Sequence, residues 1–352
     1  MNSQTEITSP RPLLDRSGRI TEEGWARYPH WTYDRKSVSA PWFRIKEWDY
    51  YYILSEDLKR GITMTVSDLG YAGLMALCWL DFENSTAVQV DTIALLPGGK
   101  ITAGESGIPM TPDSGITAFE DSKLSLRFDV RDGVRKLTFS APGLETARGE
   151  RGLEGEIVLG QEPDLESMNI ATSWEENRKR FYYNRKINCM PASGTVRLGG
   201  QEYVFRSDRD SGTIDWGRGA WPYRNRWYWG SASGYLKGEP FGFNLGYGFS
   251  DRTPASENML FYRGKAHKLE EISFHFNPSD YMKPWRVSSS DGRLELDFQP
   301  LLDRSSEVNL MLIRSAQHQV FGRFSGRVVL DDGTELMLDN FLGFAEDVLN
   351  NW

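Results

Sequence analysis

The chain has 352 residues, which is enough for two domains that each bury a core of their own. Hydrophobic residues make up 39% and charged residues 26%, a balance typical of a soluble globular protein, and the net charge of −8 disfavours general binding to nucleic acid or anionic membranes. Aromatic residues reach 13%, including 12 Trp, and together with 34 Gly they favour strands, tight turns and aromatic-lined surfaces.

The N-terminal half begins with a polar segment, and we expect residues 1–10 to form a disordered tail. Residues 11–170 are predicted to hold an N-terminal arm and a first β-barrel. The arm, at residues 13–35, carries several aromatic rings and is expected to pack across the barrel. From Trp42 onward, runs of β-branched and aromatic residues predict strands, and Asp132-Gly133 predicts a hairpin turn between two of them.

The strand pattern is interrupted at residues 168–184. Ser173, followed three residues later by Glu176, can begin a short helix because the two side chains can cap its first turn. We place the domain junction here, so that residues 171–352 form a second β-barrel that ends in a short C-terminal helix at residues 343–350. The predicted fold class is therefore mostly β, with two antiparallel barrels packed side by side and few short helices.

One predicted hairpin of the second half sets aromatic rings beside glycines. Residues 227–233 and 241–249 flank the turn Lys237-Gly238. Along the second of these strands, rings occupy one face and glycine or asparagine the other. A strand face without side chains lets a packed ring or a ligand approach the backbone closely.

Residues 215–233 are the densest aromatic and basic stretch of the chain, with four Trp, two Tyr and three Arg. Arg218 lies between two glycines, so the backbone can bend sharply there and aim the guanidinium group. A polar clamp formed by Asp215 and the three arginines would then face an aromatic wall. The alternative is a Trp-rich barrel core whose arginines form cation–π and salt-bridge pairs at the rim. The candidate ligand-binding residues are Trp216, Arg218, Trp221, Tyr223, Arg224, Arg226, Trp227, Tyr228, Trp229, Asn244, Tyr247 and Asn258.

Asp215 and Glu257 are the candidate catalytic residues. Glu257 follows the strand at residues 241–249 and could bring a second carboxylate to the mouth of the barrel. Two carboxylates among rings suit acid–base chemistry, because apolar surroundings raise one pKa while basic neighbours lower the other. The alternative is that Glu257 simply pairs with an arginine.

Familiar metal and cofactor motifs are absent from the sequence. The four histidines form no HxH or HxxxH pair and no CxxC occurs, so we expect no metal site. No GxGxxG or GxSxG motif is present, which makes a dinucleotide cofactor or a serine-hydrolase mechanism unexpected. We therefore expect no cofactor.

The two cysteines and the apolar segments indicate the compartment. Cys78 and Cys189 are too few for a disulfide framework, and two buried free thiols are expected, with a single bridge as the alternative. The N-terminus lacks the pattern of a signal peptide, and the longest apolar window, residues 71–80, is about half the length that crosses a bilayer. We expect a cytoplasmic protein with no membrane span.

Several motifs resemble the family known as domain of unknown function 2804, over most of the chain from about residue 11. They lie at residues 44–51, 181–191, 215–224 and 343–346. More distantly, the layout is similar to the two-barrel, lipocalin-like (calycin-like) group of AttH-like proteins, carotenoid hydratases (hydroxyneurosporene synthase) and pericyclase-type fungal enzymes. That group has an Asp-His pair before a Trp-Gly. Here Trp216-Gly217 is present, but Thr213 and Ile214 occupy the matching positions of the pair.

Three functional hypotheses follow. The first is a binding protein for a largely apolar small molecule, such as a lipid or an isoprenoid, held in an aromatic and arginine-lined cavity. The second is a cofactor-independent hydratase, isomerase or cyclase that uses Asp215 or Glu257 as general acid or base. The third is a carbohydrate-active protein, because tryptophan platforms and paired carboxylates also suit sugars.

Overall fold

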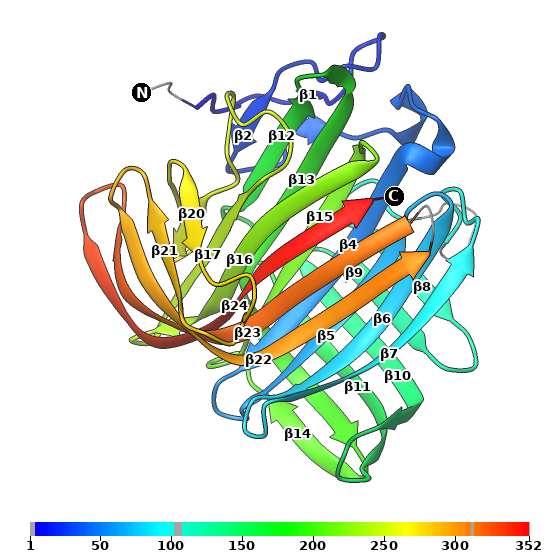
Figure 1. Cartoon of the computed structure of the whole chain (residues 1–352), viewed down its shortest axis with the longest axis vertical. Coiled ribbons are helices and arrows are strands. Elements are labelled where there is room, and N and C mark those ends of the chain that lie inside the picture. Colours follow the sequence, from blue (N-terminus) through cyan, green and yellow to red (C-terminus); the bar gives the residue numbers. More distant parts are fainter. Residues whose placement is uncertain (1–3, 102–107, 311–312, 352) are drawn as a thin grey trace.

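A computed structural model of the chain describes residues 4–101, 108–310 and 313–351, and nearly all of its regular structure is β-strand (Figure 1). Two short 3-10 helices, η1 (Arg35–Ser37) and η2 (Trp42–Arg44), are the helices of these described residues. The strands form two large, curled antiparallel sheets, each a half-barrel, and β1 (Arg11–Pro12) pairs with β3 (Trp31–Thr32) in a small separate sheet. The predicted mostly-β, two-barrel class is confirmed.

The first sheet has 13 strands, with the main order β7-β6-β5-β4-β15-β13-β11-β10-β9-β8 and with β2, β12 and β14 attached at its side. Because β7 and β8 end this order, no strand pairing closes the sheet into a full barrel among the described residues. Its strands are β2 (Gly24–Ala26), β4 (Ile45–Ser55), β5 (Arg60–Asp68), β6 (Ala72–Asp81), β7 (Thr86–Leu95), β8 (Gly115–Glu120), β9 (Ser125–Arg131), β10 (Val134–Glu145), β11 (Arg151–Gly160), β12 (Met168–Trp174), β13 (Asn177–Leu198), β14 (Gln201–Phe205) and β15 (Ser211–Ala220).

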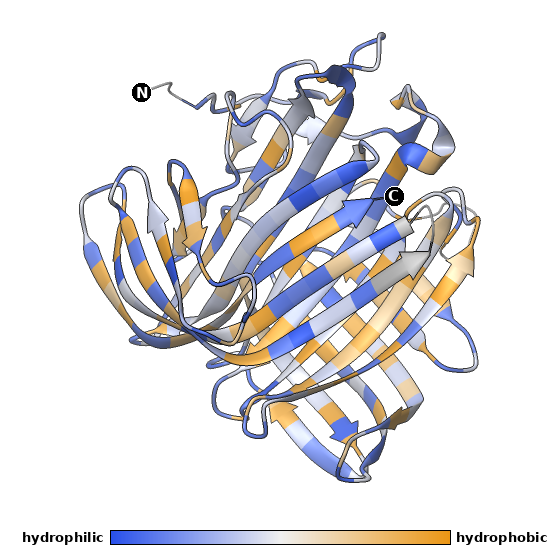
Figure 2. Cartoon of the chain, viewed as in Figure 1, coloured by the Kyte–Doolittle hydropathy of each residue, from blue (hydrophilic) through white to orange (hydrophobic). Residues whose placement is uncertain are grey.

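The second sheet has nine strands in the order β19-β18-β17-β16-β24-β23-β22-β21-β20. Its long central strands show alternating hydrophilic and hydrophobic residues (Figure 2), as expected where each face has its own surroundings. The strands are β16 (Arg224–Leu236), β17 (Glu239–Tyr247), β18 (Met259–Tyr262), β19 (Lys265–Lys268), β20 (Ile272–His275), β21 (Trp285–Ser289), β22 (Leu294–Leu310), β23 (Ile313–Val329) and β24 (Glu335–Asn351).

Two-residue turns set the register of several hairpins. Asp132-Gly133 joins β9 to β10 and Lys237-Gly238 joins β16 to β17, as the sequence predicts. In both turns the two residues have positive φ, which matches the twist of a type I′ hairpin and explains the glycine in the second position.

Each half-barrel buries an apolar core on its concave face, and the two sheets also pack against each other. A core around Phe128, Ile157 and Phe181 fills the first half-barrel, and one around Phe243 and Phe324 fills the second. Two further clusters lie where the sheets meet and combine residues of both. In Figure 1, β22–β24 cross in front of β4–β7, and the contact between Phe82, in the turn after β6, and Phe321 of β23 agrees with this packing. The interface between sheets is therefore a third buried region.

The two predicted helices are wrong. Ser173 lies in β12, where its backbone N–H and hydroxyl both donate to Glu23, and the following strand, β13, pairs with β12 as a hairpin. Residues 343–350 belong to β24, which is hydrogen-bonded on both sides, to β16 and β23. In each case, pairing with neighbouring strands outweighs the local helix signal.

The expected disorder of residues 1–10 is wrong for residues 4–10, and residues 1–3 lie outside the described part of the chain. Ile7 is buried in the first core, and the backbone N–H of Thr5 donates to the carbonyl of Pro254 in the second half. Gln4 also accepts from the backbone N–H of Ser256. This segment therefore ties the two half-barrels together.

The change from the first sheet to the second occurs between Ala220 and Arg224. Residues 215–233, expected to lie wholly in the second barrel, instead run from β15 of the first sheet into β16 of the second. The expected division into folding units at residue 170 stays a prediction.

Two other expectations concern cysteines and membranes. Cys78 and Cys189 are both buried and unpaired, so the predicted free thiols are confirmed. Within the described ranges, no helix is long and apolar enough to cross a membrane.

Candidate active site between the two half-barrels

Strand register places two polar rows opposite each other at the interface between the sheets. On the first sheet, Lys186 of β13 pairs with Asp215 of β15, which pairs with Tyr50 of β4. On the second sheet, Trp229, Glu346 and Gln319 form the matching row across β16, β24 and β23. Since paired residues share a face of their sheet, both rows point into the interface.

Lys186 is the centre of this site. Its Nζ lies 3.0 Å from Asp215 Oδ2 and 3.8 Å from Glu257 Oε2, and 3.7 Å from the centroid of the Trp229 ring. Lys186 and both carboxylates are buried. The structure therefore brings together the two predicted catalytic carboxylates, on an ammonium group that the sequence did not single out.

Neutral donors hold the two carboxylates in place. Asp215 Oδ1 accepts from Asn184 Nδ2 at 2.6 Å and from the Trp48 indole N–H at 3.2 Å. Glu257 Oε2 accepts from the Tyr182 hydroxyl at 3.2 Å. Burial raises the pKa of Glu257 above its ordinary value, so this carboxyl can hold a proton more readily than an exposed one.

A third carboxylate, Glu346, completes the acidic group. It accepts from the Trp227 indole N–H at 2.7 Å and from Gln319 Nε2 at 3.1 Å, both neutral donors. Burial raises the pKa of Glu346 to about 7, with the negative charge of Asp215 adding to the effect. Buried groups with raised pKa that converge from several strands are typical of functional sites.

Aromatic rings cover the side of this site that is nearest to solvent. Trp221 lies 5.9 Å from Trp48, 5.5 Å from Tyr182 and 5.9 Å from Trp227 between ring centroids. Trp48 and Trp227 are half-buried, and each also donates to a carboxylate beneath it. Two further half-buried rings, Trp174 and Phe249, pack on the same cluster. We call the half-buried set of Trp48, Trp174, Trp227 and Phe249 the aromatic rim.

Next to the carboxylates, a buried hydroxyl and amide cluster joins the sheets. A β-bulge in β13 after Ile187 gives Cys189 a φ of 60° and lets Asn188 reach the second sheet. Its Nδ2 donates to Ser231 Oγ at 3.1 Å and to Ser233 Oγ at 3.2 Å. The cluster fixes how the two sheets dock and hence the positions of the site residues above it.

Two glycines make room for the site. A Cβ on Gly217 would overlap the Trp48 indole, and a Cβ on Gly246 would overlap the Glu257 carboxylate. The glycine face of residues 241–249 therefore accommodates a carboxylate of the protein itself, a third possibility beside the ring or ligand that the sequence suggested.

Gly246→Ala is expected to displace Glu257 from Lys186 and Tyr182 and to lower the free energy of unfolding by about 1–3 kcal/mol, as overpacked buried sites do. Urea denaturation measures the change. Gly160→Ala is the matched control, because a Cβ there meets no atom within 4 Å, and it should change stability by less than about 0.5 kcal/mol. Equal stability of the two variants would contradict the assigned packing.

Two predicted site residues lie in the first core instead. Trp216 follows Asp215 on β15 and so faces the other way, packing edge-on against Tyr33 and Tyr183. Arg218 lies over the Trp216 ring and donates to Asp49 Oδ1 at 2.9 Å. It is fully buried, and the guanidinium holds the first half-barrel together rather than facing Asp215.

The other arginines also lie away from Asp215. Arg226 donates twice to Asp347, at 2.9 and 2.7 Å, and lies over the Tyr228 ring. Tyr228 stacks on Tyr247 at the edge of the second core. Arg224 and Tyr223 are exposed. The predicted clamp, in which the three arginines and Asp215 face one aromatic wall, is therefore wrong.

The remaining predicted residues support the site. Trp229 donates to Asn244 Oδ1 at 2.7 Å, and Asn244 Nδ2 donates to the Glu257 carbonyl at 2.8 Å. Asn258 accepts from the Gly246 backbone N–H at 2.7 Å. Trp227 belongs to the aromatic rim, and Trp221 packs beneath it against Trp48 and Trp227. The contributions of Trp48, Tyr182, Asn184, Lys186 and Glu346 had not been foreseen.

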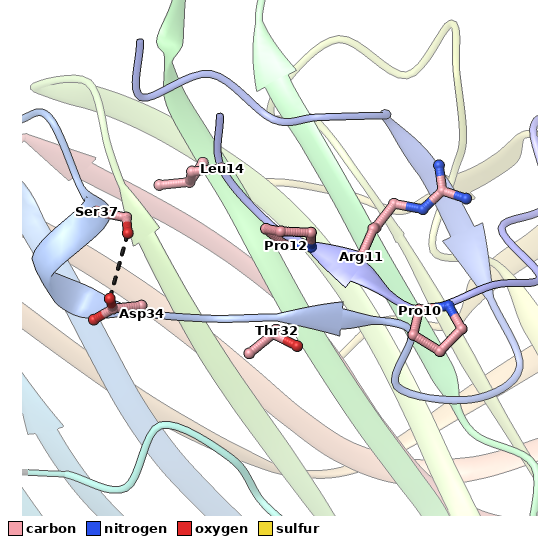
Figure 3. Close-up of a pocket in the computed structure, with 7 residues that line it drawn as sticks. All are labelled: Pro10, Arg11, Pro12, Leu14, Thr32, Asp34 and Ser37. Atoms are coloured by element: carbon pink, nitrogen blue, oxygen red, sulfur yellow. Dashed lines mark hydrogen bonds between the residues drawn. The ribbon is translucent and has the colours of Figure 1, made fainter. Parts of the chain in front are cut away.

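The described pockets lie elsewhere. Figure 3 shows one in the N-terminal arm, lined by Pro10, Arg11, Pro12, Leu14, Thr32, Asp34 and Ser37, with Ser37 Oγ donating to Asp34. A second is lined by residues of β10, β11 and β13. The predicted aromatic and arginine-lined ligand cavity of the second barrel stays a prediction.

Comparison with known proteins supports the fold. A family model described as a domain of unknown function (DUF2804) matches residues 4–352. No curated protein matches the chain. A candidate AttH protein from Nitrosomonas europaea is 13% identical, with a TM-score of 0.52 over 92% of this chain and 98% of that one. CghA, solved with Sch210972, is 10% identical, with a TM-score of 0.52 over 88% and 89%. Kievitone hydratase from Nectria haematococca is 11% identical, with a TM-score of 0.47 over 87% and 88%.

Proposed function

This chain belongs to the DUF2804 family, and we propose that it binds a largely apolar small molecule between its two half-barrels and acts on it by cofactor-independent acid–base chemistry. The observation that carries the proposal is the meeting of Asp215 and Glu257 on the ammonium of Lys186, beneath a layer of aromatic rings. Acid–base catalysis needs a proton donor and a proton acceptor held within reach of one substrate.

The two carboxylates have different surroundings, which suits different roles. Glu257 has a raised pKa because of burial, so it supplies the proton as general acid. Asp215 is ion-paired with Lys186 and accepts hydrogen bonds from Asn184 and Trp48, so it serves as the carboxylate that takes up a proton. Proton gain at one atom of the substrate and loss at another amounts to an isomerisation or a cyclisation. Attack by water on the protonated substrate, with one proton of that water passing to Asp215, amounts to a hydration.

The aromatic rim supplies the apolar binding surface and the entrance. Trp48, Trp174, Trp227 and Phe249 are half-buried, so their rotation would open a path to the carboxylates behind them. Rings of this size bury 150–250 Å² each, on the usual scale, and can hold an apolar body without specific polar contacts.

The test uses the full chain, incubated in D2O with the apolar small-molecule extract of its host and followed by mass spectrometry. The expected result is one compound that changes mass or retention only with the protein present. Asp215→Asn and Glu257→Gln should each reduce that turnover by about 100-fold or more. Glu120→Gln, which changes an exposed carboxylate on β8, should leave it intact. Unchanged turnover in both site variants would remove the mechanism, and the absence of any changed compound would count against catalysis.

A further inference from the structure

The inter-sheet site gathers three buried carboxyl groups around one cation. Asp215, Glu257 and Glu346 are 7%, 2% and 4% exposed, and Lys186 is the cation within ion-pair distance of the first two among the described residues. Among the described residues, Glu346 accepts from the neutral Trp227 and Gln319 side chains, and the Arg304 guanidinium donates to Gln319 rather than to the carboxylate. A buried carboxylate without a counter-charge is unfavourable. Such a group either keeps a proton or pairs with a cation, so a positively charged ligand would be held by the carboxylates that its arrival lets ionise.

An unpaired amide oxygen also indicates that the site takes a hydrogen-bond donor. Asn184 is fully buried and anchored by its Nδ2, which donates to Asp215 Oδ1. Its Oδ1 has no hydrogen-bond partner among the described atoms. Buried amide oxygens are nearly always bonded, so this atom indicates that a donor is missing beside Asp215. A group that carries both positive charge and N–H donors would satisfy the carboxylates and the amide oxygen together.

The rings around the carboxylates also favour a cation. The face of Trp229 already contacts the Lys186 ammonium, and the indoles of Trp48 and Trp227 lie beside Asp215 and Glu346, to which their N–H groups donate. Indole faces attract ammonium groups, more strongly where water is excluded. The aromatic rim therefore suits both the body of an apolar ligand and a charged nitrogen at its end.

We propose that the molecule taken at this site is a protonated amine with a largely apolar body, its N–H groups directed to Asp215, Glu346 and the free oxygen of Asn184. This inference rests on the proposed function for the location of the site and adds the chemical class of the substrate. The apolar body packs on the aromatic rim, and the ammonium supplies the counter-charge that the acidic group lacks.

Three probes of one shape and different charge test the inference: 2-phenylethylammonium, 2-phenylethanol and phenylacetate. Isothermal titration calorimetry of the full chain at about pH 8 compares them, since this lies above the pKa of about 7 to which burial raises Glu346. The ammonium is expected to bind about tenfold or more tightly than the alcohol, and phenylacetate more weakly than both. Equal affinity for the ammonium and the alcohol, tighter binding of phenylacetate, or binding of none of the three would overturn the inference.

A variant assigns the effect to the site. Glu346→Gln keeps an oxygen for the Trp227 indole but removes the charge, and is expected to weaken ammonium binding about tenfold while leaving the affinity for 2-phenylethanol within about twofold. Glu120→Gln is the control and should alter neither. An unchanged ammonium affinity in Glu346→Gln would contradict the assigned site. The acid–base proposal is judged separately by Asp215→Asn and Glu257→Gln, so either proposal can fail while the other stands.

Discussion

Replacing Lys186 with methionine is expected to lower the free energy of unfolding by about 3–5 kcal/mol at about pH 8, because it leaves the Asp215 carboxylate buried without its counter-charge. Methionine keeps most of the side-chain volume, so the loss reports on charge and not on a cavity. Urea denaturation at about pH 8 measures the loss.

Lys136→Met is the matched control. Lys136 forms an ion pair with Glu156 at 2.8 Å in which both side chains are about half exposed, 53% and 48%. Exposed pairs of this kind contribute up to about 1 kcal/mol. If Lys186→Met lost no more stability than Lys136→Met, the ammonium would not be a buried counter-charge and the described arrangement would be wrong.

Glu346→Gln is expected to change how stability depends on pH. The folded-state pKa of Glu346 is raised from 4.5 to about 7 by burial, so its protonated form favours the native state. That contribution is fully present below about pH 4.5 and is lost as the pH rises to about 7. Glutamine does not titrate. Between these pH values the variant should therefore gain on the order of 3 kcal/mol of stability relative to the unmodified protein.

The measurement is a series of urea denaturation curves from acid to about pH 8 on both proteins. The quantity compared is the change in the free energy of unfolding between two pH values. A constant effect of the new amide on its hydrogen bonds to Gln319 and Trp227 cancels in that comparison. Glu120→Gln, at an exposed position, should give a curve parallel to that of the unmodified protein. A parallel curve for Glu346→Gln as well would show that Glu346 ionises in the folded state as it does in the unfolded chain.

The sheet class and many hairpins were predictable because their signals are local. A turn such as Lys237-Gly238 needs two residues with positive φ, and its glycine marks the turn whatever the rest of the chain does. The two predicted helices failed for the opposite reason. Residues 343–350 favour a helix locally, but β24 lies between two long strands whose pairing only the tertiary fold supplies.

The candidate site was predictable in part. Asp215 and Glu257 stood out as carboxylates among rings, and the structure brings both to Lys186. Lys186 itself was missed, although a basic residue within the mostly apolar run of residues 181–190 was a usable signal of a buried partner. The arginines drew attention by composition, but alternation along β15 turns Arg218 to the opposite face from Asp215, where it pairs with Asp49.

The acidic site draws its members from both half-barrels: Lys186 and Asp215 come from the first, and Glu346 of β24 and Glu257, just before β18, from the second. Substitutions in the two half-barrels are therefore not independent of each other during evolution. A loss of charge at Lys186 changes which side chains are tolerated at Glu257, far away in the sequence. Divergence within the family should show this epistasis, with substitutions in one half-barrel accompanied by compensating ones in the other.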